Sequence, residues 1–189
     1  MGDRLYLGID LGTKTGYCYQ IGKGPVMAGT WDHTPRKGAG EGARFLSLWT
    51  RLDALAYQVG KPYAVGYELV QFAAKSKTGA TMVSATQVWG GYKAILTAWC
   101  EFRGVHYLPV HTATLKCFAT GHGHAKKDEM KRMFKLQLGR APLDDNEADA
   151  FHCMQWIQDT TRKGIRDHEN TVSKTADTLH AGSKQRNLL

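Results

Sequence analysis

The order of apolar and polar positions predicts three closely spaced strands followed by a helix. A nearly continuous apolar run begins at Leu5, and two further runs over 15–21 and 26–31 follow it across short Gly-containing turns. Strands joined by such short connections form an antiparallel meander. From 45 to 59, apolar residues recur every three or four positions, which predicts an amphipathic helix that stops at the Gly and Pro after it.

Strand and helix patterns alternate through the second half of the chain. The expected order is a buried strand, a long helix with little charge, a short strand, a brief helix, a basic helix and a last helix. Their expected ranges are 63–69, about 80–102, 105–110, 112–118, a segment that ends at Gly139, and about 142–159.

Length and composition divide the chain near position 160. A chain of 189 residues can form one domain with a buried core. From Arg162 on, the sequence is rich in Thr, Ser and Lys, with almost no aliphatic residue before Leu179. We expect one domain over 1–160 and a basic polar extension, mobile or peripheral, over 161–189.

Charge and cysteine spacing narrow the class of protein. The formal net charge of +8 and a pI near 9.4 favour a polyanionic partner, above all nucleic acid; a merely soluble basic surface is the alternative. No run approaches the ~18 apolar residues of a membrane span, and no signal region follows Met1, so we expect a cytoplasmic protein without a membrane segment.

The cysteines form no Cys-x-x-Cys pair, so we expect reduced core residues rather than zinc ligands or disulfides. They are Cys18, Cys100, Cys117 and Cys153.

Two carboxylates stand in otherwise apolar strand patterns. Asp10 lies in the first strand, before a Gly-rich turn, and Glu68 lies near the end of the strand over 63–69. Because an uncompensated buried charge is expensive, such an acid is either a hydrogen-bonded structural residue or a ligand for a cation. The segment around Asp10 also resembles the phosphate loop of actin-like proteins, but those need two such domains, and the length of this chain counts against them.

A third group of acids, Asp144-Asp-Asn-Glu-Ala-Asp149, opens the last predicted helix. Asp145 and Asp149 are four positions apart, so on a helix they project from one face. Helix capping is the alternative for Asp144 and Asp145, whereas Asp149 borders the apolar face. Two strand carboxylates and a helix carboxylate together would form an all-oxygen site suited to Mg²⁺ or Mn²⁺, and two such ions can hydrolyse a phosphodiester.

The order of elements resembles the RNase H fold, and five separated motifs resemble the RuvC-type Holliday-junction resolvases. They span most of the chain from Leu5 to Trp156, and their order makes the resemblance specific. This resemblance implies an α/β protein with an RNase-H-like mixed five-stranded sheet, an antiparallel meander plus parallel strands, flanked by helices. The motifs are Leu7-Gly-Ile-Asp-Leu-Gly-Thr-Lys-Thr-Gly-Tyr17, Glu68-Leu-Val-Gln-Phe72, Leu115-Lys116, Gly121-His-Gly-His-Ala-Lys-Lys127 and Glu147-Ala-Asp-Ala-Phe151.

The resemblance implies that Asp10, Glu68 and Asp149 are ligands of Mg²⁺, with Mn²⁺ as a substitute and two ions in each site. The family usually has a further Asp or His three residues before the last acid. Asn146 stands there in this chain. We expect Asp145 to supply the fourth acid, with Asn146 or Asp144 as the alternatives.

The resemblance also implies contacts with DNA. Lys127 matches the lysine of the family's Gly-x-Gly-x-Ala-x-Lys segment, where an ammonium can stabilise charge on the scissile phosphate; a solvated lysine at a helix start is the alternative. Phe72 matches the place of an aromatic at the junction centre, with an inward-packed loop anchor as the alternative. His122 and His124 are expected to contact phosphate rather than to bind metal. The other candidates for DNA contacts are Lys14, Lys75, Lys77, Lys116 and Lys126.

Together these expectations describe a homodimeric, Mg²⁺-dependent endonuclease that resolves four-way DNA junctions by paired nicks. A two-fold junction needs two active sites held by symmetry, and the helix over 80–102 is the expected dimer surface. Two other functions are alternatives. One is a relaxed nuclease for flaps, forks or RNA–DNA hybrids, and the other is a junction-binding protein without catalysis.

Overall fold

The computed structural model describes residues 3–70 and 79–164, with side chains from 85 onward in the second range. Phe72, Lys75 and Lys77 lie outside the described residues, as does most of the extension over 161–189. The compact unit that carries the sheet is Met1–Ile157, and it is described here by itself.

Five strands form one mixed sheet in the order β3-β2-β1-β4-β5. The antiparallel meander consists of β1, β2 and β3, and the parallel part consists of β4 beside β1 and β5 beside β4. The expected sheet is confirmed, with ends that differ by a residue or two. The strands are β1 (Leu5–Asp10), β2 (Lys14–Ile21), β3 (Val26–Asp32), β4 (Ala64–Leu69) and β5 (His106–His111).

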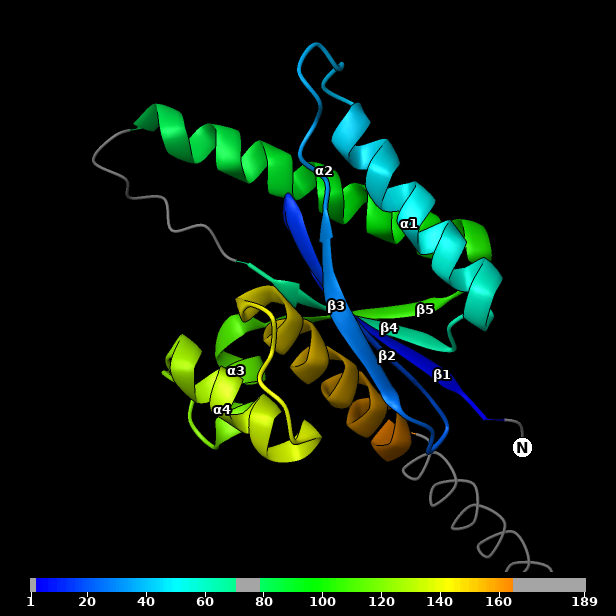
Figure 1. The fold of residues 1–189 in the computed structure, drawn as a ribbon, viewed down its shortest axis with the longest axis vertical. Helices are drawn as coiled ribbons and strands as arrows, with labels where there is room; N and C mark the ends of the chain where they lie inside the picture. Colours follow the sequence, from blue (N-terminus) through cyan, green and yellow to red (C-terminus); the bar gives the residue numbers. More distant parts are fainter. Residues whose placement is uncertain (1–2, 71–78, 165–189) are drawn as a thin grey trace, which may run out of the picture. The chain divides into compact units, whose positions relative to one another are not determined.

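Helices cover both faces of the sheet (Figure 1). On one face, α1 (Ala43–Val59) and α2 (Gly79–Arg103) enclose a core with Leu52, Leu96 and Trp99. On the other face lie α3 (Thr112–Thr120), α4 (Lys127–Leu138) and the last helix. The last helix begins at position 145 and continues through 164 in the described residues.

Two details differ from the sequence prediction. The last helix passes its expected end near 159, where Lys163 pairs with Asp159 one turn before it. The prediction of a core position was wrong for Cys117, which is exposed because α3 buries only Leu115 and Ala119. The other three cysteines are buried, and none of the four is in a disulfide. Within the described residues, no helix is long and apolar enough to cross a membrane.

Three strand glycines, Gly8, Gly16 and Gly66, lie against the last helix and form what we call the glycine floor. A Cβ atom on Gly8 would lie 2.1 Å from the Ala150 carbonyl oxygen, and one on Gly16 would lie 1.9 Å from the Asn146 carbonyl oxygen. A Cβ atom on Gly66 would lie 2.6 Å from the Cys153 carbonyl oxygen in the same helix. Helix backbone therefore lies directly on strand backbone, without an intervening layer of side chains.

Candidate functional site

Two carboxylates meet at one edge of the sheet because β1 and β4 are parallel neighbours. Ile9 is paired with Tyr67, so Asp10 and Glu68 occupy the next position on each strand. Asp10 is half-buried and ends β1, while Glu68 is buried, with 8% of its surface exposed. The sequence predicted this convergence from two acids in apolar strands.

Asp149 is brought to the same edge by the glycine floor. It precedes Ala150, whose carbonyl oxygen faces Gly8 in β1. Burial raises the pKa of Asp149 to about 7, and the nearby charges of Glu68 and Asp145 add to this effect. Burial, followed by the charges of Asp149 and Glu68, also raises the pKa of Asp10 well above its usual range. These three carboxylates, Asp10, Glu68 and Asp149, are called the acidic centre below.

Asp144 caps the last helix and ties it to the meander. Its Oδ1 atom accepts a hydrogen bond from the Thr30 hydroxyl at 2.8 Å and another from the Glu147 backbone N–H at 2.9 Å. The buried Glu147 side chain accepts from the Leu143 backbone N–H and from Arg140 at 2.6 Å. Asp144 therefore has the helix-capping role that was the alternative to a metal ligand for this acid. Its charge also raises the pKa of Asp10.

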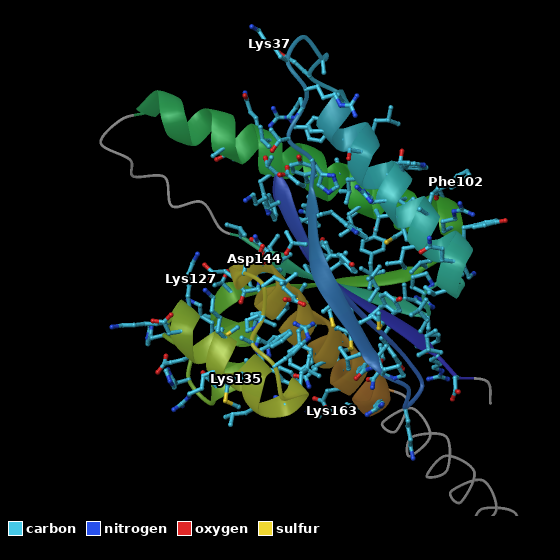
Figure 2. All side chains as sticks on the ribbon, viewed as in Figure 1. Lys37, Phe102, Lys127, Lys135, Asp144 and Lys163 are labelled. Atoms are coloured by element: carbon cyan, nitrogen blue, oxygen red, sulfur yellow. The ribbon has the colours of Figure 1, made fainter. Side chains whose placement is uncertain are left out.

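Asp145 is held by two lysines of α4. Lys127 Nζ donates to Asp145 Oδ2 at 2.5 Å, and Lys131 Nζ donates to Asp145 Oδ1. These bonds keep the pKa of Asp145 below its ordinary value and raise the pKa values of Lys127 and Lys131. Lys127 also lowers the pKa values of Asp10 and Asp149, so its ammonium acts on the acidic centre directly. Figure 2 shows Lys127 and Asp144 at the neighbouring ends of their two helices.

Other predicted contact residues lie around this edge. The charge of Lys116 on α3 lowers the pKa of Asp149, so it acts on the acidic centre. Lys14 begins β2 and is exposed, and Lys126 is exposed at the N-cap of α4. His122 and His124 are also exposed, and the former lies 3.7 Å from Glu129, measured from Nε2 to Oε1.

A groove runs beside Glu68 and offers polar groups along its wall. Its lining includes His111, Thr112 and Thr114 at the start of α3, and Gly123 of the loop before α4. The groove has a volume of about 750 Å³. Of the acidic centre, Glu68 lines this groove, together with the apolar Leu69, Val70 and Ala113.

The donor set suits a hard divalent cation, although the side chains are not arranged around one. Among the described residues, no three His, Cys, Asp or Glu side chains are arranged to hold a metal ion. The raised pKa values of Asp10 and Asp149 nevertheless mark carboxylates whose charge the protein leaves uncompensated. A cation bound there would supply the missing positive charge, so the chemistry of the residues fits Mg²⁺ or Mn²⁺.

Sequence reasoning missed three contributors to the site. Thr30 reaches it from β3, and nothing in the local sequence of that strand indicates this contact. Lys131 was visible as the residue one helical turn after Lys127, on the same face. The glycines of the floor were visible as Gly inside strand patterns, a signal of close backbone approach. Thr15, beside Lys14, is buried and donates to the Gly12 carbonyl oxygen at 2.7 Å within its turn.

The meander, the parallel strands β4 and β5, and the helices on both faces define an RNase-H-like α/β protein. Its fold is that of RuvC. The RuvC structure of Thermus thermophilus matches with a TM-score of 0.63 and 24% identity, over 85% of this chain and 96% of that one. The T. thermophilus RuvC in complex with a Holliday junction substrate matches with a TM-score of 0.66 and 22% identity, over 80% and 90%.

A more distant protein has the same fold. The yeast mitochondrial Holliday junction resolvase Ydc2 matches with a TM-score of 0.52 and 15% identity, over 78% of this chain and 75% of that one. No family model and no curated protein matches the chain. The similarity to these solved structures confirms the expected RuvC-type, RNase-H-like fold.

Proposed function

We propose that this protein is a metal-dependent endonuclease that resolves four-way DNA junctions by paired nicks. The observation that carries the proposal is the meeting of Asp10, Glu68 and Asp149 at one sheet edge, with lysines around them, on the fold of RuvC. A protein that only binds DNA has no use for several negative charges facing phosphate. Because the net charge is +8, the rest of the surface can still attract the polyanion.

Mg²⁺ held by Asp10, Glu68 and Asp149 would activate water and stabilise the leaving oxygen of the phosphodiester. The protein's own residues have separate tasks. Lys127 lies where its ammonium can contact the scissile phosphate, since it acts on both Asp10 and Asp149. The groove beside Glu68, whose lining includes Thr112 and Thr114, can accept the sugar–phosphate backbone next to the cut.

Paired nicks need two sites, and the outward face of α2 is our proposed dimer surface. Gly90, Ala94 and Ala98 recur every fourth position on this face, opposite the buried Tyr92, Leu96 and Trp99. A Cβ atom on Gly90 would meet no atom within 4 Å. The stripe is small rather than bulky, so a second copy of the helix could approach closely.

The direct test is cleavage of an immobile four-way junction in Mg²⁺, with nicks mapped on both strands. We expect symmetric paired cuts by the unaltered protein and intact binding without cleavage by Asp10→Asn. Forks, flaps, RNA–DNA hybrids and plain duplex should be compared at the same salt concentration, since electrostatic affinity varies steeply with salt. Scattered single nicks on all branched substrates would favour the relaxed nuclease. Binding without any cleavage would favour the non-catalytic protein.

The dimer is tested separately by sedimentation. Ala94→Arg places a long cation on the outward stripe of α2 and should yield monomers that nick junctions singly. Tyr57→Arg is the control, because Tyr57 on α1 is 93% exposed and a charge there costs little. A dimer that persists in Ala94→Arg would exclude this surface.

A further inference from the structure

A pair of lysines beside the acidic centre shares one carboxylate. Lys127 and Lys131 each bond a different oxygen of Asp145, so both of its oxygens are engaged. Lys127 is 75% exposed and Lys131 is 38% exposed, while Asp145 is 27% exposed. The ammonium groups therefore remain open to a ligand from solvent, and the carboxylate lies behind them.

This arrangement opposes the intrinsic preferences of α4. Lys127 and Lys131 are four positions apart near the N-terminus of the helix, where like charges repel each other and the helix dipole disfavours cations. Asp128 and Glu129 in the first turn already satisfy the dipole. Asp145 compensates one of the two positive charges, so the group of three keeps a net charge of +1.

The neighbouring acid, Asp144, differs from Asp145 in that neither of its oxygens bonds a lysine among the described residues. Its charge acts on Asp10, as do the charges of Asp149 and Glu68. The two hydrogen bonds to Asp144 both end on Oδ1, so its second oxygen can turn toward an ion. Asp145 would have to lose its bonds to both lysines before its oxygens could bind an ion.

We propose that Asp145 is a positioning residue that holds Lys127 and Lys131 at the rim of the acidic centre, and that Lys131 contacts the phosphate backbone of the bound DNA strand. The inference rests on the proposed nuclease function. It assigns to Lys131 a phosphate contact beside that of Lys127, and it leaves the ion to the acidic centre, with Asp144 as a further oxygen donor.

The phosphate contact is tested by the salt dependence of junction binding in EDTA. Each phosphate contact contributes about 0.9 to the slope of log Kd against log salt. We expect Lys131→Met to weaken binding roughly three- to ten-fold and to lower the slope by about 0.9, and Lys131→Arg to restore both. Lys23→Met is the matched control, because Lys23 lies in the β2–β3 turn at the opposite end of the sheet. An unchanged slope in Lys131→Met overturns the contact.

The role of Asp145 is tested by metal titration without DNA. In calorimetry with Mn²⁺, we expect Asp145→Asn to bind within about two-fold of the unaltered protein and Asp10→Asn to bind at least about ten-fold more weakly. Asp145→Asn should also keep its junction affinity while turnover falls about ten-fold, because the lysines lose their anchor. A loss of Mn²⁺ affinity equal to that of Asp10→Asn would make Asp145 a ligand and overturn the proposal.

The same measurements separate this inference from the proposed function. If the unaltered protein binds neither Mn²⁺ nor the junction, the nuclease function itself fails. If the unaltered protein binds both, and only the Asp145 and Lys131 variants depart from expectation, the positioning role fails alone.

Discussion

Replacing Asp149 by Asn is expected to stabilise the metal-free protein at alkaline pH. The pKa of Asp149 is raised from its ordinary value of 3.8 to about 7, so the folded state holds this proton more strongly than the unfolded state. Stability is therefore lost as the pH rises from about 4 through about 7, and the full penalty is present above pH 7. At 1.36 kcal/mol for each pKa unit, the penalty is at most about 4 kcal/mol. Because the side chain is only half-buried, we expect about 2 kcal/mol.

The assay is thermal and urea unfolding in EDTA at pH 4.5, 6, 7 and 8. In a protein of this size, 1 kcal/mol moves the Tm by roughly 2–4 °C, so Asp149→Asn should melt about 4–8 °C higher than the unaltered protein at pH 8. At pH 4.5 the difference should shrink to about 1–2 °C, because only about a quarter of the penalty is present so close to the ordinary pKa of 3.8. Saturating Mg²⁺ should stabilise the unaltered protein and reduce the difference at pH 8.

Asp53→Asn is the control with the opposite sign. Asp53 accepts hydrogen bonds from Arg103 at 2.7 Å and from Trp99 at 2.6 Å, and these bonds lower its pKa. Its contribution to stability is present above the ordinary pKa and is lost as the pH falls, so this variant should be less stable at pH 8. The reasoning is refuted if Asp149→Asn loses stability at pH 8 in EDTA. An equal gain at pH 4.5 and pH 8 would also refute it, since packing rather than charge would then be the cause.

Three further changes test the elements that build the site. Gly8→Ala puts a methyl group 2.1 Å from the Ala150 carbonyl oxygen and should lower the free energy of unfolding in urea by about 3 kcal/mol or more. Gly90→Ala is the control, because a methyl group there meets no atom within 4 Å, and it should stabilise the monomer by about 0.5–1 kcal/mol. Thr30→Val removes the hydrogen bond to the Asp144 cap and should cost about 1 kcal/mol, whereas the exposed Thr50→Val on α1 should have almost no effect on the same unfolding curve. Lys116→Met removes a charge that lowers the pKa of Asp149, so the carboxyl should titrate at higher pH by NMR, and an unchanged titration would place Lys116 away from the acidic centre.

The sequence predicted the strand part of the site and missed the contacts that depend on how helices dock. Asp10 and Glu68 were recognisable because each interrupts an apolar run, and parallel neighbouring strands bring such positions to one edge. The partnership of Asp145 with Lys131 depends on where α4 lies relative to the start of the last helix, which no local pattern encodes. Thr30 likewise becomes a partner of Asp144 only through the packing of the last helix on the meander.

The glycine floor explains why a helix carboxylate can join two strand carboxylates at all. Gly8 and Gly66 are directly paired in neighbouring strands, and both face backbone of the last helix. Side chains at these positions would lift the helix away and separate Asp149 from Asp10, because the residue beside Asp149 is the one that touches Gly8. Two strand positions without side chains thus set the distance between the acids. Burial raises the pKa values of Asp10 and Asp149, and the repulsion among the acids adds to this effect, so the same close packing that builds the acidic centre also makes it need a cation.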